Sequence, residues 1–143
     1  MVEVADSGAS EALKETEKVE ARLEHVNVTV GDADRSAELL QLLFGWKVRW
    51  AGPAMNGGRA VHVGTDSQYL ALYSSADADG RPLGWSKGLP LNHVAIEVGD
   101  LEAVERKVVE AGLTPFAHGD YEPGRRFYFF DPDGIEFEVV SYS

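Results

Sequence analysis

The chain of 143 residues contains no cysteine. A disulfide framework, a thiolate metal site and a cysteine nucleophile are therefore all excluded. The chain also lacks any run of about 18 apolar residues, which a membrane-spanning helix would require. Its N-terminus is acidic and has no apolar segment of the kind found in a signal peptide. These absences predict a soluble, cytoplasmic protein that does not interact with a membrane.

Basic residues are scarce as well. Lys and Arg number 13 against 24 Asp and Glu, which gives a formal net charge of −11. A nucleic-acid partner requires a basic surface, and none is visible in the sequence. The acidity is compatible with a cationic ligand, although a high net charge is more often a feature of solubility. Hydrophobic residues make up 44% of the chain, which is sufficient for one compact domain or two small, closely packed repeats.

An internal repeat is the most informative feature of the sequence. Residues 23–32 read LEHVNVTVGD and residues 91–100 read LNHVAIEVGD. Both segments alternate in the manner of a half-buried strand, and each ends in Gly-Asp, whose Asp can cap a following helix. The helices predicted next, Ala33–Phe44 and Leu101–Ala111, both stop at a glycine. Glycine at that point is the usual signal of a helix C-terminus.

Each half continues in the same order after its helix. A strand-like stretch follows (47–51 and 114–118), and then a hairpin (59–74 and 125–141) with turn-forming residues at its centre. This order predicts an α+β fold of two βαβββ modules, at residues 22–75 and 91–143. Residues 76–90, which are rich in Gly and Pro, are predicted to be the linker, and residues 1–21 an N-terminal extension with a helix from Ser10 to Ala21.

Three polar side chains lie in apolar strands, where a buried charge is costly unless it is paired or bound to a metal. His25 and His93 occupy equivalent positions in the first strand of each half, and Glu138 lies in the last strand. The fourth equivalent position holds Ala71. Two imidazoles and one carboxylate form a facial triad that leaves coordination positions open for substrate. The simpler alternative is that the histidines are hydrogen-bonded structural residues and that the carboxylate of Glu138 faces water.

The remaining candidates carry weaker signals. Alignment of the halves pairs His62 with Phe129, which predicts a structural role for His62, and His118 lies in a stretch that reads as a solvated loop. Tyr128 is ten residues before Glu138, on the neighbouring strand of the predicted hairpin. Its phenol either reaches the same cavity as that carboxylate, as a catalytic donor, or belongs to an aromatic core strand.

The chain resembles the vicinal oxygen chelate superfamily, which comprises glyoxalase I, bleomycin resistance proteins, extradiol dioxygenases and fosfomycin-modifying enzymes. The resemblance covers about residues 22–142 and rests on the two His-containing strands and on FYFFDPDGIEFEVV. It implies a curved mixed sheet around a central cavity, and a divalent metal held by His25, His93 and Glu138. It also implies a homodimer, and a metal that chelates vicinal oxygens of the substrate. The triad favours Fe²⁺, with Mn²⁺, Zn²⁺ and Ni²⁺ as alternatives.

The chain departs from the residue patterns of three families within this superfamily, and each departure argues against assigning the chain to that family. Glyoxalase I has a glutamate where this chain has Ala71. Fosfomycin thiol transferases have a threonine where it has Asn27. They also have an arginine past the strand of the final glutamate, whereas the sequence here ends at Ser143. Extradiol dioxygenases share the triad and a tyrosine at Tyr128, but their further acid–base histidine has no match within residues 76–90.

Two functions therefore stand side by side. The first is a metal-dependent enzyme that acts on a small oxygen-chelating substrate by dioxygenase-like, isomerase or lyase, or epoxide-opening chemistry. The alternative is a non-catalytic dimer that binds or sequesters a ligand, as bleomycin resistance proteins do. The acidity of the chain suits a cationic ligand, and Trp46, Trp50 and Trp85 could stack on it.

Overall fold

The computed structural model of the chain describes residues 22–86 and 88–143, so the helix predicted over Ser10–Ala21 lies outside the described residues. The elements follow in the order β1 (His25–Thr29), α2 (Ala33–Phe44), β2 (Lys47–Pro53), the short 3₁₀ helix η1 (Met55–Gly57), β3 (Arg59–Gly64), β4 (Tyr69–Ser74), β5 (Val94–Glu97), α3 (Leu101–Glu110), β6 (Phe116–Tyr121), β7 (Gly124–Phe130) and β8 (Glu136–Ser141). Neither α2 nor α3 is long and apolar enough to cross a membrane.

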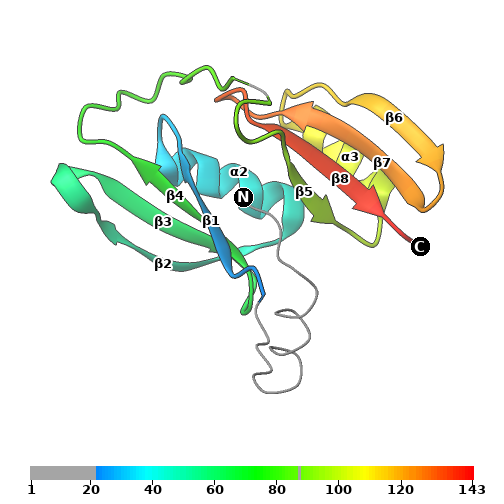
Figure 1. Cartoon of the computed structure of the whole chain (residues 1–143), viewed down its shortest axis with the longest axis horizontal. Coiled ribbons are helices and arrows are strands. Elements are labelled where there is room, and N and C mark those ends of the chain that lie inside the picture. The colour runs from blue at the N-terminus through cyan, green and yellow to red at the C-terminus, as the bar shows by residue number, and fades with distance from the viewer. Residues whose placement is uncertain (1–21, 87) are drawn as a thin grey trace, which may run out of the picture.

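The eight strands form two mixed sheets of four, with the orders β1-β4-β3-β2 and β5-β8-β7-β6. The first strand of each module runs parallel to the last one, and the other pairs are antiparallel. Figure 1 shows the two sheets side by side, with α2 and α3 behind them, and the two helices pack against each other. The predicted α+β fold of two βαβββ modules is confirmed.

Both helices begin as the repeat predicts, and α2 also ends as predicted, whereas α3 ends one residue early, at Glu110. The carboxylates of Asp32 and Asp100 accept hydrogen bonds from backbone N–H groups of the first helical turn, which satisfies donors that would otherwise lack a partner. Gly45 ends α2 in the left-handed conformation, with a φ of 69°, where glycine has no steric penalty. The buried side of α2 includes Leu40 and Leu43, which pack in the common core.

Each sheet has one face covered by its helix and one that we call the open face. In β7, Phe127 and Phe129 are fully buried in the core, whereas the alternate residues Arg126 and Tyr128 point to the other side. Because side chains alternate along a strand, the same division applies to β3, where His62 lies between two buried valines. The predicted metal site therefore requires its ligands to come together on the open faces of the sheets.

The strand predicted at residues 114–118 is present but lies further along the chain. It forms β6 over Phe116–Tyr121 and pairs with β7. The pairing is irregular, since the register shifts between Phe116 and Gly119 and Ala117 has a φ of 55°. A bulged edge strand loses the regular alternation by which strands are recognised, which explains why its bounds were misplaced.

The turn between β7 and β8 joins the two modules through Asp133. This side chain is 1% exposed, and its Oδ1 accepts hydrogen bonds from the N–H of Gly31 at 3.0 Å and of Leu83 at 3.3 Å. Its Oδ2 lies 4.0 Å from the guanidinium of Arg35 on α2. Asp133 therefore links the second module to the first module and to the linker at the same time.

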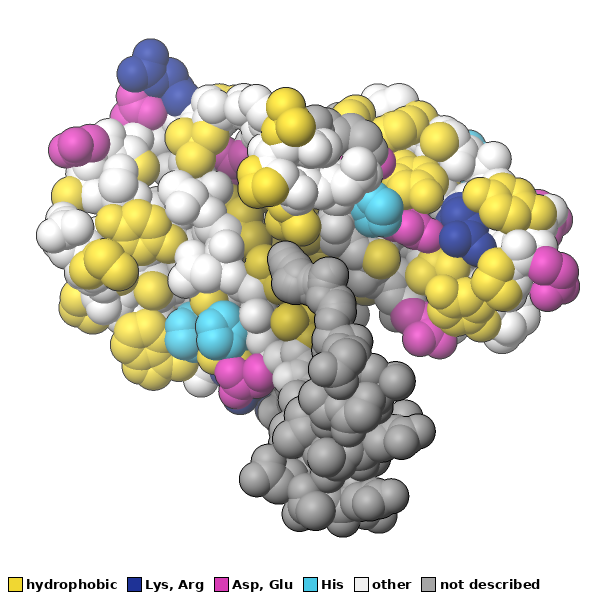
Figure 2. All heavy atoms as spheres, viewed as in Figure 1, with side chains coloured by type: hydrophobic (Ala, Val, Ile, Leu, Met, Phe, Trp, Pro, Cys, Tyr) yellow, Lys and Arg dark blue, Asp and Glu magenta, His cyan; other side chains and the backbone are white. Residues whose placement is uncertain are grey.

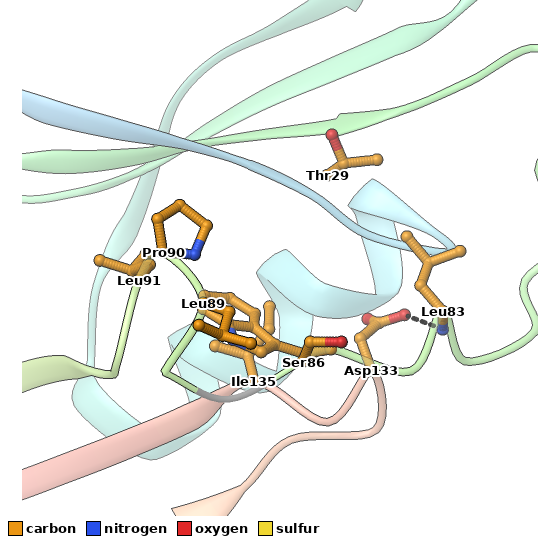
Figure 3. A pocket seen from close by; sticks show the side chains of 9 residues that line it. Thr29, Leu83, Ser86, Leu89, Pro90, Leu91, Asp133 and Ile135 are labelled. Carbon is orange, nitrogen blue, oxygen red and sulfur yellow. Dashed lines mark hydrogen bonds between the residues drawn. The ribbon is translucent and has the colours of Figure 1, made fainter.

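A pocket of about 290 Å³ lies beside this junction. Its walls are mainly apolar linker side chains, such as Leu83 and Leu89, together with Ile135 of the second module, as Figure 3 shows. None of the predicted metal ligands lines it. The pocket is therefore a feature of the module junction and not of the predicted site.

Candidate metal centre

Two of the three predicted ligands meet on the open face of the second sheet. His93 directly precedes β5, which runs parallel to β8 and so brings the imidazole beside Glu138. Nε2 of His93 lies 3.0 Å from Oε1 of the buried Glu138. The other ring nitrogen is 2.9 Å from the side-chain oxygen of Asn92, so the imidazole is held from both sides. Such a partner on the outer nitrogen is typical of metal-binding histidines.

The same carboxylate also forms an ion pair with Arg126, a residue that the sequence did not single out. Nη1 of Arg126, on β7, donates to the second oxygen of Glu138 at 3.1 Å. The side chain of Arg126 is 13% exposed, although arginines are seldom buried. The strand alternation could have placed Arg126 on the open face, but its burial depends on the side chains around it.

Tyr128 lies on the open face, directly opposite Glu138 in the register of β7 and β8. His93 approaches its ring edge-on, with 5.7 Å between the ring centroids. Burial, and then the negative charge of Glu138, raise the pKa of the Tyr128 phenol. The hydroxyl group is therefore protonated at neutral pH and can donate a hydrogen bond. Its catalytic role stays a prediction.

The third predicted ligand, His25, lies elsewhere, on the open face of the first sheet. Its Nδ1 is 2.8 Å from the carboxylate of Glu24, and its ring stacks on Tyr69 at 4.8 Å. A cleft of about 400 Å³ separates this part of β1 from β5 of the second module. Among residues 22–86 and 88–143, no three His, Cys, Asp or Glu side chains come together as a metal-binding group. Figure 2 shows two histidine side chains over the first sheet, apart from the one over the second.

Four rings form a row across the open face of the first sheet. Trp50 contacts His62 with 5.1 Å between the ring centroids, His62 contacts Tyr69 at 4.8 Å, and Tyr69 contacts His25. Each ring comes from a different strand. Burial, and then the nearby His25, lower the pKa of His62, so its imidazole is neutral at neutral pH.

The predicted pairing of His62 with Phe129 is wrong. His62 lies opposite Ala71 in the hairpin, as Tyr128 lies opposite Glu138, so His62 is the structural equivalent of Tyr128. The turn covers residues 65–68 in the first module and 131–135 in the second, and this extra residue changes the offset within the hairpin. The reason for regarding His62 as structural is thereby removed.

His118 is not on a loop, as predicted, but in β6, where its Nε2 lies 2.7 Å from the carboxylate of Glu105 on α3. It therefore does not belong to the His93–Glu138 cluster. Ala71, which occupies the position in the first module that is equivalent to Glu138, is buried and contributes only a methyl group. Its neighbours across the sheet are Asn27 and His62.

Residues 22–139 match the sequence profile of the Glyoxalase/Bleomycin resistance protein/Dioxygenase superfamily. The chain belongs to this superfamily. The resemblance found in the sequence is thereby confirmed, whereas no curated protein matches the chain.

Solved structures share the fold over nearly the whole chain. A glyoxalase/bleomycin resistance protein/dioxygenase domain from Frankia sp. EAN1pec is 20% identical, with a TM-score of 0.74 over 87% of this chain and 94% of that one. The trypanothione-dependent glyoxalase I of Leishmania major is 20% identical, with a TM-score of 0.70 over 86% and 88%. The fosfomycin resistance protein FosX of Listeria monocytogenes, solved with Mn(II) and sulfate, is 15% identical, with a TM-score of 0.68 over 87% and 95%. At such identities, the likeness establishes the fold and leaves the reaction open.

Proposed function

We propose that the chain is a metal-dependent enzyme of the superfamily that acts on a small oxygen-chelating substrate. The observation that carries the proposal is the 3.0 Å contact between His93 and Glu138 on an open sheet face. An imidazole and a carboxylate in contact are a suitable pair of donors for a divalent ion. Membership of a superfamily that includes the Mn(II)-containing FosX of Listeria monocytogenes supports the same reading.

The third ligand is proposed to be His25 of the partner subunit. In a single chain His25 lies on the other sheet, and the described residues hold no complete group of three donors. A homodimer that places the open face of one first sheet against the open face of the other second sheet would bring the imidazole to His93 and Glu138. By two-fold symmetry such a dimer has two equivalent sites.

Each side chain of the proposed site has a separate chemical role. A bound divalent ion supplies Lewis acidity to the substrate oxygens. His93 and Glu138 hold that ion, with Fe²⁺ favoured by the donor set and Mn²⁺, Zn²⁺ and Ni²⁺ as alternatives. The protonated phenol of Tyr128 donates a hydrogen bond to a substrate oxygen. The methyl group of Ala71 offers neither ligand nor base, so the proposed reaction is dioxygenase-like, isomerase or lyase chemistry without a fourth protein ligand.

Metal content tests this proposal directly. Purified protein is reloaded anaerobically with Fe²⁺, Mn²⁺, Zn²⁺ or Ni²⁺, and bound metal is counted by elemental analysis. We expect about one ion per chain in the wild type and almost none in His93→Ala or Glu138→Ala. His118→Ala is the matched control, because this histidine pairs with α3 and should leave metal content unchanged. Equal metal content in all four proteins would refute the assignment.

A mixed dimer separates a site shared between subunits from a site within one chain. One subunit carries His25→Ala and the other His93→Ala, with different affinity tags for purification. If sites are shared, each heterodimer keeps one intact site, made from His25 of one subunit and His93 of the other, and binds one ion. If each site lies within one chain, both sites are damaged and the heterodimer binds none.

One observation favours the alternative of a metal-free ligand-binding dimer. Arg126 already compensates the charge of Glu138, so this carboxylate has a partner without a metal ion. The row of four rings on the first sheet would then be a stacking surface for the ligand. Absence of bound metal in the wild type, together with binding of an aromatic dye that Trp50→Ala abolishes, would favour this function over the enzyme.

A further inference from the structure

Arg126 has more hydrogen-bonding capacity than the protein satisfies. A guanidinium carries five N–H donors. Nη1 donates to Glu138 at 3.1 Å and Nη2 donates to the carbonyl of Gly124 at 3.4 Å. Nε is buried and has no partner among the described residues. Unsatisfied buried donors are uncommon in folded proteins and often mark a place where a further group binds.

A bound metal would change the charge balance at Arg126. The guanidinium is compensated by Glu138, which also contacts His93. A divalent ion held by the same carboxylate would leave Arg126 without its own negative partner. A positive charge in a half-buried site is costly until an anion compensates it.

The surroundings of Arg126 also limit what the anion can be attached to. The guanidinium lies over the ring of Tyr121, 5.0 Å from its centroid, and Tyr128 is the next residue along the same face of β7. Phe116 lies beside Tyr128, with 6.0 Å between the ring centroids. A charged group at Arg126 would thus be flanked by aromatic surface, which suits a compact organic acid better than a strongly hydrated polar molecule.

We propose that Arg126 binds an anionic oxygen group of the substrate, so that the site accepts a small organic carboxylate or phosphonate. The planar guanidinium matches either group through paired N–H donors. This inference rests on the proposed metal-dependent function, because the metal supplies the positive charge that the anion compensates. The competing role for Arg126 is only to orient Glu138, and the experiment below distinguishes the two.

The test uses the full chain loaded with Mn²⁺ and two probes, methylphosphonate and benzoate, titrated separately by calorimetry. The variants are Arg126→Gln, which removes the charge, and Arg126→Lys, which keeps it but loses the planar fork. Arg125→Gln is the matched control, because Arg125 is the neighbouring residue but pairs with Glu102 on α3. Thermal unfolding verifies that each variant is folded, and Arg126→Lys decides the question if Arg126→Gln does not fold.

We expect at least one probe to bind the wild type, with affinity reduced about tenfold or more in Arg126→Gln and by a smaller factor in Arg126→Lys. Arg125→Gln should bind it as the wild type does. The probe that binds more tightly identifies the substrate group as a carboxylate or a phosphonate. The inference is overturned if neither probe binds, or if loss of Arg126 changes Mn²⁺ affinity alone and leaves probe affinity unchanged.

The same titration without metal keeps this inference separate from the proposed function. Weaker binding that still depends on Arg126 is expected there, because the positive charge is smaller. If the protein takes up no metal, the proposed function fails, but Arg126-dependent binding of a probe to the metal-free protein would still support the anion site. Absence of such binding in both states would exclude the anion site.

Discussion

Replacement of Asp133 by alanine tests how the two modules are held together. The substitution removes the acceptor for two N–H groups, those of Gly31 and Leu83. A buried donor left without an acceptor, here the N–H of Gly31, costs about 1–3 kcal/mol, and loss of the part-buried bond from Leu83 costs about 1 kcal/mol. Asp133→Ala should therefore destabilise the protein by about 2–4 kcal/mol. The guanidinium of Arg35 also loses its carboxylate. A loss of this size is a large part of the roughly 5–15 kcal/mol by which domains are usually stable.

Urea unfolding, followed by circular dichroism, measures the change in free energy of unfolding. Asp133→Asn is the informative companion, because it keeps the Oδ1 acceptor and removes only the charge facing Arg35. Arg35 is 39% exposed, and an ion pair of this kind contributes about 1 kcal/mol or less. We therefore expect most of the stability to return in Asp133→Asn.

The internal repeat supplies the control. Asp66 lies in the corresponding turn of the first module, between β3 and β4, but its side chain is 88% exposed and contacts only Lys47 among the ion pairs of the described chain. Asp66→Ala should therefore leave the free energy of unfolding almost unchanged. If Asp133→Ala costs no more than Asp66→Ala, Asp133 does not hold the modules together and the reasoning is wrong.

Four further predictions follow from single contacts. Burial raises the pKa of Asp131 from 3.8 to about 6, so its contribution to stability is complete below about pH 4 and is lost as the pH rises through 6. Asp131→Asn should therefore gain on the order of 3 kcal/mol relative to the wild type between about pH 4 and 7, measured by urea unfolding at each pH. Tyr128→Phe should leave metal content unchanged but weaken binding of the oxygen chelator acetohydroxamate about tenfold, by titration calorimetry; equal affinity would exclude the proposed hydrogen bond. His62→Ala interrupts the row of four rings and should lower the free energy of unfolding by about 1 kcal/mol, whereas His62→Phe should not; thermal unfolding measures both. Gly31→Ala places a Cβ 2.3 Å from the carbonyl oxygen of Arg81, so a loss of about 2 kcal/mol or more is expected in urea unfolding.

Local features of the fold were predictable from the sequence because their causes are local. The caps at Asp32 and Asp100 act on N–H groups within the next turn, and the alternation along β3 and β7 decides which side chains leave the core. The neighbourhood of His93 and Glu138 was also predictable, since parallel pairing of β5 with β8 is contained in the βαβββ order. The repeat therefore identified the module and the open-face positions of these two candidate ligands.

Other features depend on contacts that no local pattern contains. Equivalence of His62 with Tyr128 depends on one extra residue in a turn, and the strand at Phe116–Tyr121 depends on pairing with β7 across a bulge. The burial of Arg126 against Glu138 and Tyr121 requires three strands to be in place.

His25 shows most clearly the difference between what local sequence determines and what long-range contacts determine. The sequence alone identified it as the equivalent of His93, because a repeat is a property of the order of residues. Whether two equivalent side chains meet depends on how one module is placed against the other, through long-range contacts such as those of Asp133 with Gly31 and Arg35. In the tertiary structure this packing puts the two histidines on separate sheets. A second subunit is therefore the proposed source of the third ligand.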